Sequence, residues 1–283
     1  MSYITTVSGI HFYPLDPNPN DIDIKDIAHA LSLICRANGH FKYFYSVAQH
    51  CIACAREAIE RGFSLEVILG CLLHDASEAY LCDVTRPVKK HIPQYLQAEE
   101  KLQGVIWKRF AGRVMTETEQ QLIFEIDDHI LSQEFHLLMP EDLNEDYRKL
   151  KSSCACEYQE PQEVKERFIQ LARILQHEMT MRESERLLRT KVNADRLQSL
   201  ISELEAYYTS DEWKRDFADG EAGLLPKKLQ RGVLSEDGIY NLLEEYKEAS
   251  EGHFTSTAVF VRNRGQIGWR GLFCKSSAEI SRS

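Results

Sequence analysis

The sequence has 283 residues, of which 43% are hydrophobic and 10% aromatic, so it can form one large domain or a medium domain with an appendage. Its formal net charge of −10 argues against non-specific binding to duplex DNA or to an anionic membrane. A local cationic cluster can still attract a phosphorylated small molecule. We therefore expect a small-molecule partner and no nucleic acid.

The chain carries no recognisable signal for membrane insertion or export. No stretch approaches the roughly 18 uninterrupted apolar residues of a membrane helix, and residues 1–6 lack the basic and apolar segments of a signal peptide. The eight cysteines are therefore interpreted as reduced thiols. A cytoplasmic location without membrane contact is predicted.

Turn and capping residues divide the first half into helices. Residues 1–25 are expected to form an extended lead-in, because prolines interrupt helix formation there. Ser64 and Thr116 suit helix N-caps, and Gly62 and Gly112 suit helix ends. Helices are expected over residues 27–36, 45–61, 64–78, 94–110 and 116–135, with an aromatic loop over 37–46.

The second half is predicted to be helical as well. Periodicity resumes over residues 164–175, and this helix is expected to pack back on the first half. A charged, nearly uninterrupted helix is predicted over 182–208, followed by a helix that begins near Trp213 and by a last helix. Residues 252–283, rich in Gly, Ser, Thr and Arg, predict a poorly ordered tail.

These elements predict an almost all-α protein in two parts. A helical bundle over residues 1–180 is followed by a smaller helical module over 181–251. The module lacks a cluster of His, Cys or acidic residues that looks catalytic, so an accessory or oligomerising role is favoured over a second active site. Assembly into a homo-oligomer stays open.

The adjacent pair His74-Asp75 is the strongest sign of a functional site. It follows the apolar run 67–73, and burying two ionisable groups costs free energy unless they are paired or bind a metal. Neighbours on a helix point about 100° apart, so both can touch one ion at that edge. Glu78 lies four residues after His74 and hence on the same side of a helix.

Two other helices offer further ligands. His50 lies on the first turns of the helix over 45–61, and Asp127 borders the apolar face of a later helix. Each signal is weak alone, because a single buried histidine is more often a hydrogen-bonded core residue and a single acid is usually solvated. Together with His74 and Asp75 they supply two imidazoles and two carboxylates, a set that suits a divalent transition metal.

Several short motifs follow one another along the first half. They are Ile27-Ala-His-Ala-Leu-Ser32, Cys35-Arg36, Ser46-Val-Ala-Gln-His50, His74-Asp-Ala-Ser-Glu78, Asp83-Val-Thr-Arg-Pro-Val-Lys89, Ile126-Asp-Asp-His-Ile-Leu-Ser-Gln-Glu134 and Leu138-Met-Pro140. In this order they resemble the HD-domain metal-dependent phosphohydrolases, and more closely the branch of 5′-deoxynucleotidases and deoxynucleotide triphosphohydrolases. Residues 181–251, with a loop and last helix over 220–246, resemble a small helical bacterial domain of unknown function.

The resemblance to the HD-domain enzymes implies a role for each motif. The implied ligands of one divalent metal ion are His50, His74, Asp75 and Asp127. Glu78 and Asp83 are implied to orient or deprotonate the attacking water, and Arg36 to bind phosphate. The ion stays open among Mn, Co, Fe, Ni, Zn and Mg, because geometry and availability decide its identity as much as affinity does. Cys82 departs from the family pattern, in which Gly often precedes the aspartate.

Basic groups beside these motifs are candidates for substrate binding. Arg36 and Lys42 flank the start of the aromatic loop, whose rings either stack on a base or fill the core. Lys89 lies in the only tight basic cluster of the first half, residues 86–91. We expect Arg36, Lys42 and Lys89 to bind substrate, since a guanidinium or ammonium group pairs well with phosphate.

Four further residues near the motifs are expected to lie outside the metal site. Cys51 and Cys54 form a CxxC beside His50, but no second such pair has the spacing of a zinc finger, so buried thiols are favoured. His129 and Glu134 are predicted to face solvent or neighbouring helices.

The predicted activity is the metal-dependent hydrolysis of a phosphate ester or anhydride in a nucleotide, either a deoxynucleoside monophosphate or a triphosphate. Arg36 and Lys89 would offset charge on the phosphoryl oxygens. An HD-type phosphodiesterase or alarmone hydrolase is a second interpretation. A non-catalytic protein that senses nucleotides is the third.

Overall fold

The computed structural model describes residues 3–139, 149–153 and 156–251 and confirms the predicted all-α class. In this part of the chain the only sheet is an antiparallel pair, β1 (Ile4–Thr5) and β2 (His11–Phe12). The helices are α1 (Ile24–Leu33), α2 (Val47–Arg61), α3 (Leu65–Leu73), α4 (Glu78–Leu81), α5 (Arg86–Lys89), α6 (Pro93–Ala111), α7 (Glu117–Leu138), α8 (Pro161–Thr190), α9 (Ala194–Tyr208), α10 (Asp211–Glu221) and α11 (Glu236–Glu251), with short 3-10 turns η1 (Pro19–Asp21), η2 (Arg36–Gly39) and η3 (Gly232–Leu234).

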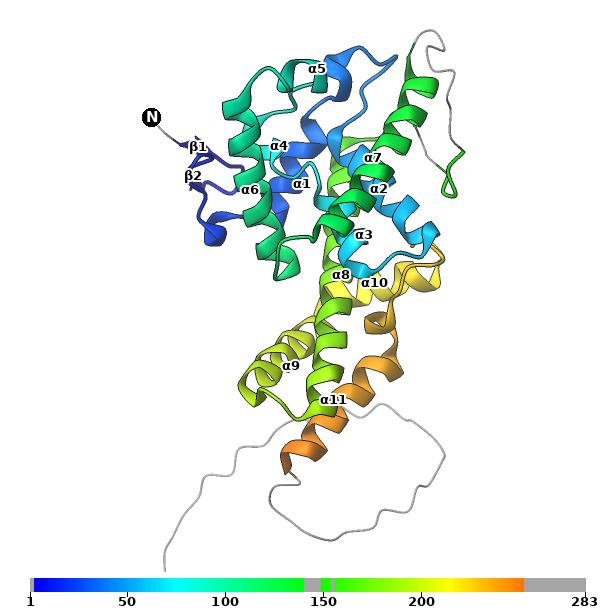
Figure 1. The fold of residues 1–283 in the computed structure, drawn as a ribbon. Coiled ribbons are helices and arrows are strands. Elements are labelled where there is room, and N and C mark those ends of the chain that lie inside the picture. Colours follow the sequence, from blue (N-terminus) through cyan, green and yellow to red (C-terminus); the bar gives the residue numbers. More distant parts are fainter. Residues whose placement is uncertain (1–2, 140–148, 154–155, 252–283) are drawn as a thin grey trace, which may run out of the picture.

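Figure 1 shows two groups of helices joined by the long helix α8. The upper group contains α1 to α7 around α3, and the lower group contains α9, α10 and α11 beside the end of α8. Among the described residues, no helix is long and apolar enough to cross a bilayer. The tail over 252–283, predicted to be poorly ordered, lies outside the described residues.

Helix α3 forms the centre of the upper bundle. All of its residues from Leu65 to Leu73 except Glu66 are buried, and it packs against α2, α6, α7 and α8. Gly70 allows the close approach of α7, since a Cβ atom at that position would lie 2.4 Å from Cδ1 of Ile123. Asp127 follows Ile123 by about one helical turn, so this contact brings its carboxylate towards the end of α3.

The predicted helix over 64–78 is wrong over residues 74–77, because α3 ends at Leu73. A turn with i to i+3 hydrogen bonds replaces the helix, and α4 begins at Glu78. Gln103 of α6 supports this break: its amide nitrogen donates to the carbonyl oxygen of Leu73 at 2.7 Å, and its oxygen accepts from the backbone of Ser77 at 3.2 Å. The carbonyl oxygen of Leu73 also accepts from the backbone of Ala76 at 3.0 Å, so Gln103 adds a second bond there and supplies the acceptor for the N–H of Ser77.

The single helix predicted over 182–208 is also wrong. Helix α8 ends at Thr190, and Lys191 and Asn193 adopt left-handed backbone conformations with φ of 52° and 58°. The side-chain oxygen of Asn193 accepts from the backbone of Arg196 at 3.2 Å and so caps α9. Val192, in the break between the two helices, is 59% exposed.

A buried carboxylate fastens the lower helices to α8. Asp216 of α10 is fully buried, and its two oxygens accept from the Arg173 guanidinium of α8 at 2.7 and 2.8 Å. The hydroxyl of Tyr207 in α9 donates to the same carboxylate at 2.7 Å. One side chain therefore ties three helices together, and the domain limit predicted near residue 180 falls inside the continuous helix α8.

Candidate metal centre

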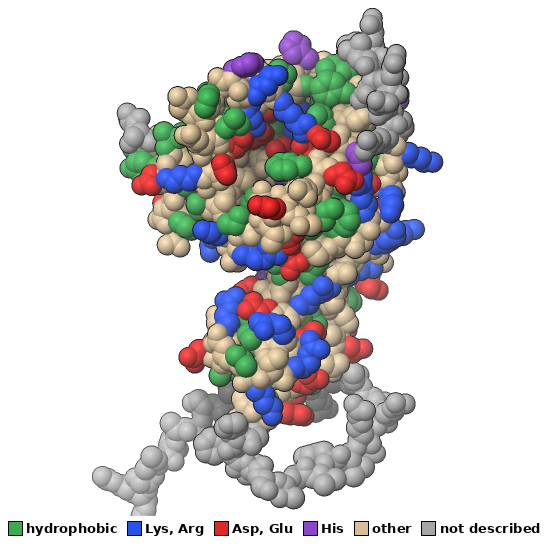
Figure 2. Space-filling view, in the orientation of Figure 1, with side chains coloured by type: hydrophobic (Ala, Val, Ile, Leu, Met, Phe, Trp, Pro, Cys, Tyr) green, Lys and Arg blue, Asp and Glu red, His purple; other side chains and the backbone are tan. Residues whose placement is uncertain are grey.

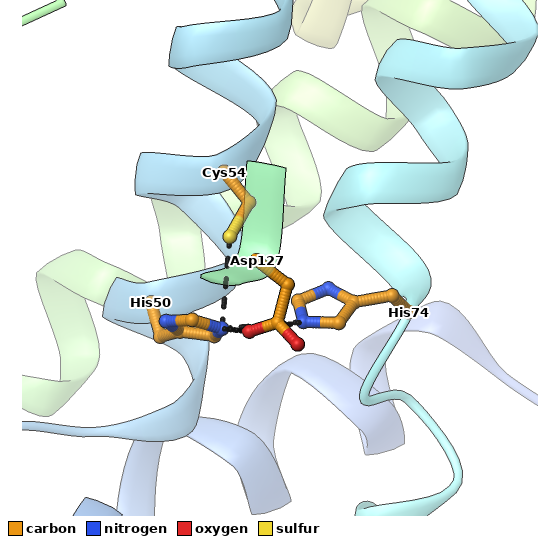
Figure 3. A group of neighbouring side chains, drawn as sticks. All are labelled: His50, Cys54, His74 and Asp127. Atoms are coloured by element: carbon orange, nitrogen blue, oxygen red, sulfur yellow. Dashed lines mark hydrogen bonds and ion pairs between the residues drawn. The ribbon is translucent and has the colours of Figure 1, made fainter. Parts of the chain in front are cut away.

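Three elements of the upper bundle bring the candidate ligands to one place. The capping box of Ser46 and Gln49 starts α2, which carries His50 on its first turn. His74 and Asp75 follow the buried end of α3, and Asp127 lies in the middle of α7. Figure 3 shows the side chains of His50, His74 and Asp127 pointing towards one another.

The distances between the ligand atoms are short. Nε2 of His50 lies 3.2 Å from Nε2 of His74 and 3.0 Å from Oδ1 of Asp127. Oδ2 of Asp75 lies 3.3 Å from Nε2 of His74 and 3.8 Å from Nε2 of His50. Ligands about 2.0–2.2 Å from one ion have such mutual separations. The four residues proposed from the sequence therefore lie close together, with His50, His74 and Asp127 in one group and Asp75 in a second group that shares His74.

The other nitrogen of each imidazole is held by an acceptor. Nδ1 of His74 donates to the carbonyl oxygen of Cys71 at 2.8 Å, which fixes the hydrogen on Nδ1. Nδ1 of His50 pairs with Oε1 of Glu134 at 2.7 Å, and this carboxylate is fully buried. Both Nε2 atoms are thereby left to face the common centre, as in proteins that bind metal through imidazole.

Glu134 thus faces the neighbouring helix α2, but its role behind His50 was not predicted. The available signal was its position seven residues after Asp127, which places both acids on one face of α7. His129 also faces α2, where its Nδ1 lies 2.5 Å from the guanidinium of Arg61.

The ionisable groups of the centre change one another's pKa values. Burial raises the pKa of Asp75, but His74 and Arg36 outweigh burial and hold that pKa far below its usual value. Burial lowers the pKa of His74, but Asp75 and further neighbours raise it well above its usual value. A proton on His74 therefore competes with a metal ion, so metal affinity is expected to increase with pH.

A pocket of about 330 Å³ opens beside these residues, and Figure 2 shows a hollow on the upper bundle with acidic side chains inside it and cationic ones beside it. The charged residues that line the pocket are Arg36, Asp75, Glu78, Asp83, Arg86, Lys89 and Asp127. Its size is near the lower end of the range for sites that bind small molecules.

Most of the predicted catalytic and substrate residues lie in this pocket. Arg36, on η2, contacts Oδ2 of Asp75 through Nη1 at 3.1 Å. Glu78 is buried, and its Oε2 has no hydrogen-bond partner among the described residues. Burial and the carboxylates of Asp75 and Asp83 raise the pKa of Glu78 well above its usual value. Lys89 pairs with Glu99 at 2.6 Å and approaches Glu78 at 3.7 Å.

Lys42 does not belong to the pocket, contrary to prediction. Its ammonium group donates instead to the carbonyl oxygen of Leu137 at 3.1 Å, and its side chain is exposed. The rings of the aromatic loop mostly fill the core: Phe41 and Tyr45 pack with Leu138 in a small buried cluster, and Phe41 also lines the pocket.

Arg86 was not singled out although it belongs to the predicted basic cluster. Its guanidinium contacts Oδ2 of Asp127 and Oδ1 of Asp128, both at 2.5 Å, and it lines the pocket. The cluster over 86–91 was the available signal, but the sequence does not tell which of its cations points inward.

Cys51 and Cys54 are fully buried, as predicted, but contrary to prediction both lie beside the candidate metal ligands; burial raises the pKa of both thiols, that of Cys51 to about 11. Sγ of Cys54 lies 3.6 Å from Nε2 of His50. The atoms that can bind metal in His50, Cys54, His74 and Asp127 all lie within 4.8 Å of one another. Cys51 forms a second such group with His74 and Asp75.

The fold and the site define an all-α protein with a buried His/Cys/Asp group that can hold a metal ion. Residues 171–254 match a family described as a domain of unknown function, DUF4298. This agrees with the resemblance of the C-terminal part to a small helical domain of unknown function.

Two curated relatives match over 110 residues each. The uncharacterized protein YfdR of Escherichia coli K12 is 46% identical over 39% of this chain, and an uncharacterized protein of Rhodobacter capsulatus is 39% identical over 37% of it. The chain spans 59% and 56% of the lengths of these relatives. Neither name records an activity.

Proposed function

We propose that this protein is a metal-dependent phosphohydrolase of the HD type that acts on nucleotides. The convergence of His50, His74, Asp75 and Asp127 on one centre beside a cation-lined pocket is the observation that carries the proposal. The donor set fits a divalent ion, because imidazole and carboxylate ligands suit Mn, Fe, Co, Ni and Zn.

A divalent ion in this centre would lower the pKa of a bound water and polarise a phosphoryl oxygen. The protein itself supplies the base and the cations. Glu78 is the candidate for accepting the proton of the attacking water, since its raised pKa brings proton exchange closer to neutral pH. Asp83, whose pKa is raised mainly by burial, lines the same pocket and would help to orient that water.

Three cations would bind the phosphate of the substrate. Arg36 and Lys89 were proposed from the sequence, and Arg86 lines the same pocket. Their side chains would offset the charge that develops on the phosphoryl oxygens. The apolar wall formed by Phe41 and Phe135, whose ring centroids lie 5.6 Å apart, offers a surface for the sugar or base.

The size of the pocket favours a free nucleotide over an oligonucleotide. Deoxynucleoside mono- and triphosphates are therefore the first substrates to compare. The test measures release of phosphate or pyrophosphate by protein stripped with EDTA and reloaded with Mn²⁺, Co²⁺ or Mg²⁺.

Glu78→Gln should lower the turnover of the reloaded protein by about 10²–10⁴-fold, as expected for loss of a general base, while metal content stays unchanged. Glu100→Gln is the matched control, because Glu100 is exposed on α6 and lies outside the pocket. Folded, metal-loaded protein that leaves every nucleotide intact contradicts the proposal. Hydrolysis of diesters alone would indicate a phosphodiesterase, and thermal stabilisation by nucleotide without turnover would indicate a sensor.

A further inference from the structure

We infer that Cys54 is an additional ligand of the metal centre and that its thiolate directs the site towards a transition metal such as Zn²⁺ or Co²⁺ and away from Mg²⁺. The inference rests on the metal centre of the proposed function and extends it to the identity of the ion. Cys54 lies one helical turn after His50 on α2, and both side chains are fully buried. Residues four apart on a helix share one face, so both point towards the same point.

The separation between the two side chains fits common ligation. A sulfur about 2.3 Å from an ion and a nitrogen about 2.0–2.1 Å from it lie about 3.5–3.6 Å apart when the angle at the ion is tetrahedral. The observed distance from Sγ of Cys54 to Nε2 of His50 is 3.6 Å. Figure 3 shows Cys54, His50, His74 and Asp127 arranged around a common point, and their ligand atoms all lie within 4.8 Å of one another.

The orientation of His50 supports the same assignment. Its Nδ1 is engaged by Glu134, so the lone pair of Nε2 faces the thiol and the other ligands. Asp75 is paired with Arg36, whose Nη1 lies 3.1 Å from its Oδ2. The group of His50, Cys54, His74 and Asp127 therefore offers one sulfur together with two imidazole nitrogens and a carboxylate oxygen.

Metal binding by Cys54 exchanges a proton for the ion. The S–H bond breaks, the sulfur keeps the electron pair and donates it to the metal, and the proton leaves to the buffer without any change of oxidation state. Thiolate is a soft ligand that favours Zn²⁺ and similar ions, whereas Mg²⁺ prefers oxygen ligands in octahedral geometry. Because the site combines sulfur and nitrogen ligands, we expect it to bind Mg²⁺ more weakly than Zn²⁺.

The test is a spectroscopic titration of the full chain with Co²⁺ after removal of metal. Wild-type protein is expected to bind one Co²⁺ per chain and to show the near-ultraviolet charge-transfer band of a cobalt–thiolate bond. Cys54→Ser should retain Co²⁺ binding but lose this band, with an affinity for Zn²⁺ at least about tenfold lower. Cys54→Ala repeats the measurement if the serine variant does not fold.

Cys71→Ser is the matched control, since Cys71 is a buried thiol of the neighbouring helix α3 that belongs to neither ligand group. It should keep the band. Co²⁺ bound by wild-type protein without the band overturns the assignment, as does loss of the band in Cys51→Ser but not in Cys54→Ser. Wild-type protein that binds no Co²⁺ overturns both this inference and the metal centre. A band in protein that hydrolyses no nucleotide supports the ligand assignment and contradicts only the proposed function.

Discussion

Glu134 and His50 form a buried acid–imidazole pair behind the candidate metal centre. The pair lies 2.7 Å apart, and Nε of Arg36 approaches the other carboxylate oxygen at 3.5 Å. A carboxylate in this position orients the imidazole and makes it a stronger ligand. We therefore expect a change at Glu134, inside the core, to alter the affinity of His50 for a metal ion.

Replacing Glu134 by Gln should lower metal affinity by about 10–100-fold, because the shape is kept while the charge that supports His50 is lost. Calorimetric titration of metal-free protein with Zn²⁺ measures the change, and circular dichroism checks that the fold persists. Glu100→Gln, which removes an exposed charge, should bind Zn²⁺ like the wild type. Equal affinities for wild type and Glu134→Gln would show that the pair has no such role.

Cys82, immediately before Asp83, adopts φ of 71° and ψ of 153°, a conformation that glycine accepts and side chains with a Cβ atom rarely do. Replacing Cys82 by Gly should raise the free energy of unfolding by about 1 kcal/mol, since relief of strain exceeds the entropy cost of glycine. Cys82→Ala separates the effects, because it removes the exposed thiol but keeps Cβ. Urea denaturation measures the free energy of unfolding of both variants. An equal increase in the alanine and glycine variants would show that the backbone at Cys82 is not strained.

At this scale the sequence identified the residues whose chemistry is rare in a core. His50, His74, Asp75 and Asp127 were recognisable because burying an ionisable group costs free energy unless it is paired or binds a metal. Glu134 and Cys54 were not, because an acid on a helix and a thiol in a core are both ordinary until their partners are known. The direction of Lys42 depends on a contact with Leu137, far along the chain, that no local pattern reveals.

Helix α7 carries Asp127, and its start is stabilised by a charged cap. Thr116 and Glu119 form a capping box, and both oxygens of Glu119 also accept from the guanidinium of Arg113. Hydrogen bonds from Arg113 are the largest cause that lowers the pKa of Glu119, from 4.5 to about 2. Its folded-state pKa is therefore below the unfolded value.

The sign of the pH effect follows from this shift. The contribution of ionised Glu119 to stability is complete above about pH 4.5 and is lost as the pH falls towards 2. Glu119→Gln should thus be less stable than wild type by about 0.5–1 kcal/mol at pH 7, and the difference should shrink steadily below pH 4.5. Urea denaturation across this range tests it, with Glu100→Gln as the control for loss of one charge. A difference in the free energy of unfolding that stays constant down to pH 2 would show that the ionised form of Glu119 does not stabilise the helix start.

Helix ends were predictable where their chemistry is local. Ser64 and Thr116 cap helices, and Gly62 and Gly112 end them in left-handed conformations, as their types indicate. The breaks after Leu73 and Thr190 were not predictable. The first depends on Gln103 reaching over from α6, and the second on non-glycine residues in a left-handed conformation, which sequence patterns do not favour.

At the scale of the whole molecule, α8 belongs to both groups of helices. Its first half packs against α1, α2 and α3, and its second half packs against α9 and α11. The all-α class was predictable from periodicity, but the sharing of one helix was not, because a change in composition near residue 181 looks like a boundary. The Asp216 contact with Arg173 further joins the parts.

We expect the two parts to unfold together, since melting either one removes the packing partners of half of α8. Trp107 in the bundle and Trp213 in the module report on each part, so Trp107→Phe and Trp213→Phe variants, each with Trp269→Phe, provide separate fluorescence probes. The two denaturation midpoints should coincide after correction for the stability of each variant, measured by circular dichroism. Separate transitions within one variant would show that the parts are independent.

The metal centre itself is tested most directly by anomalous X-ray scattering from crystals equilibrated in turn with Mn²⁺, Co²⁺ and Zn²⁺. We predict one strong anomalous peak for at least one of these ions, about 2.0–2.2 Å from Nε2 of His50, Nε2 of His74 and a carboxylate oxygen of Asp127. Crystals that show no peak among these side chains with any of the three ions would contradict the account.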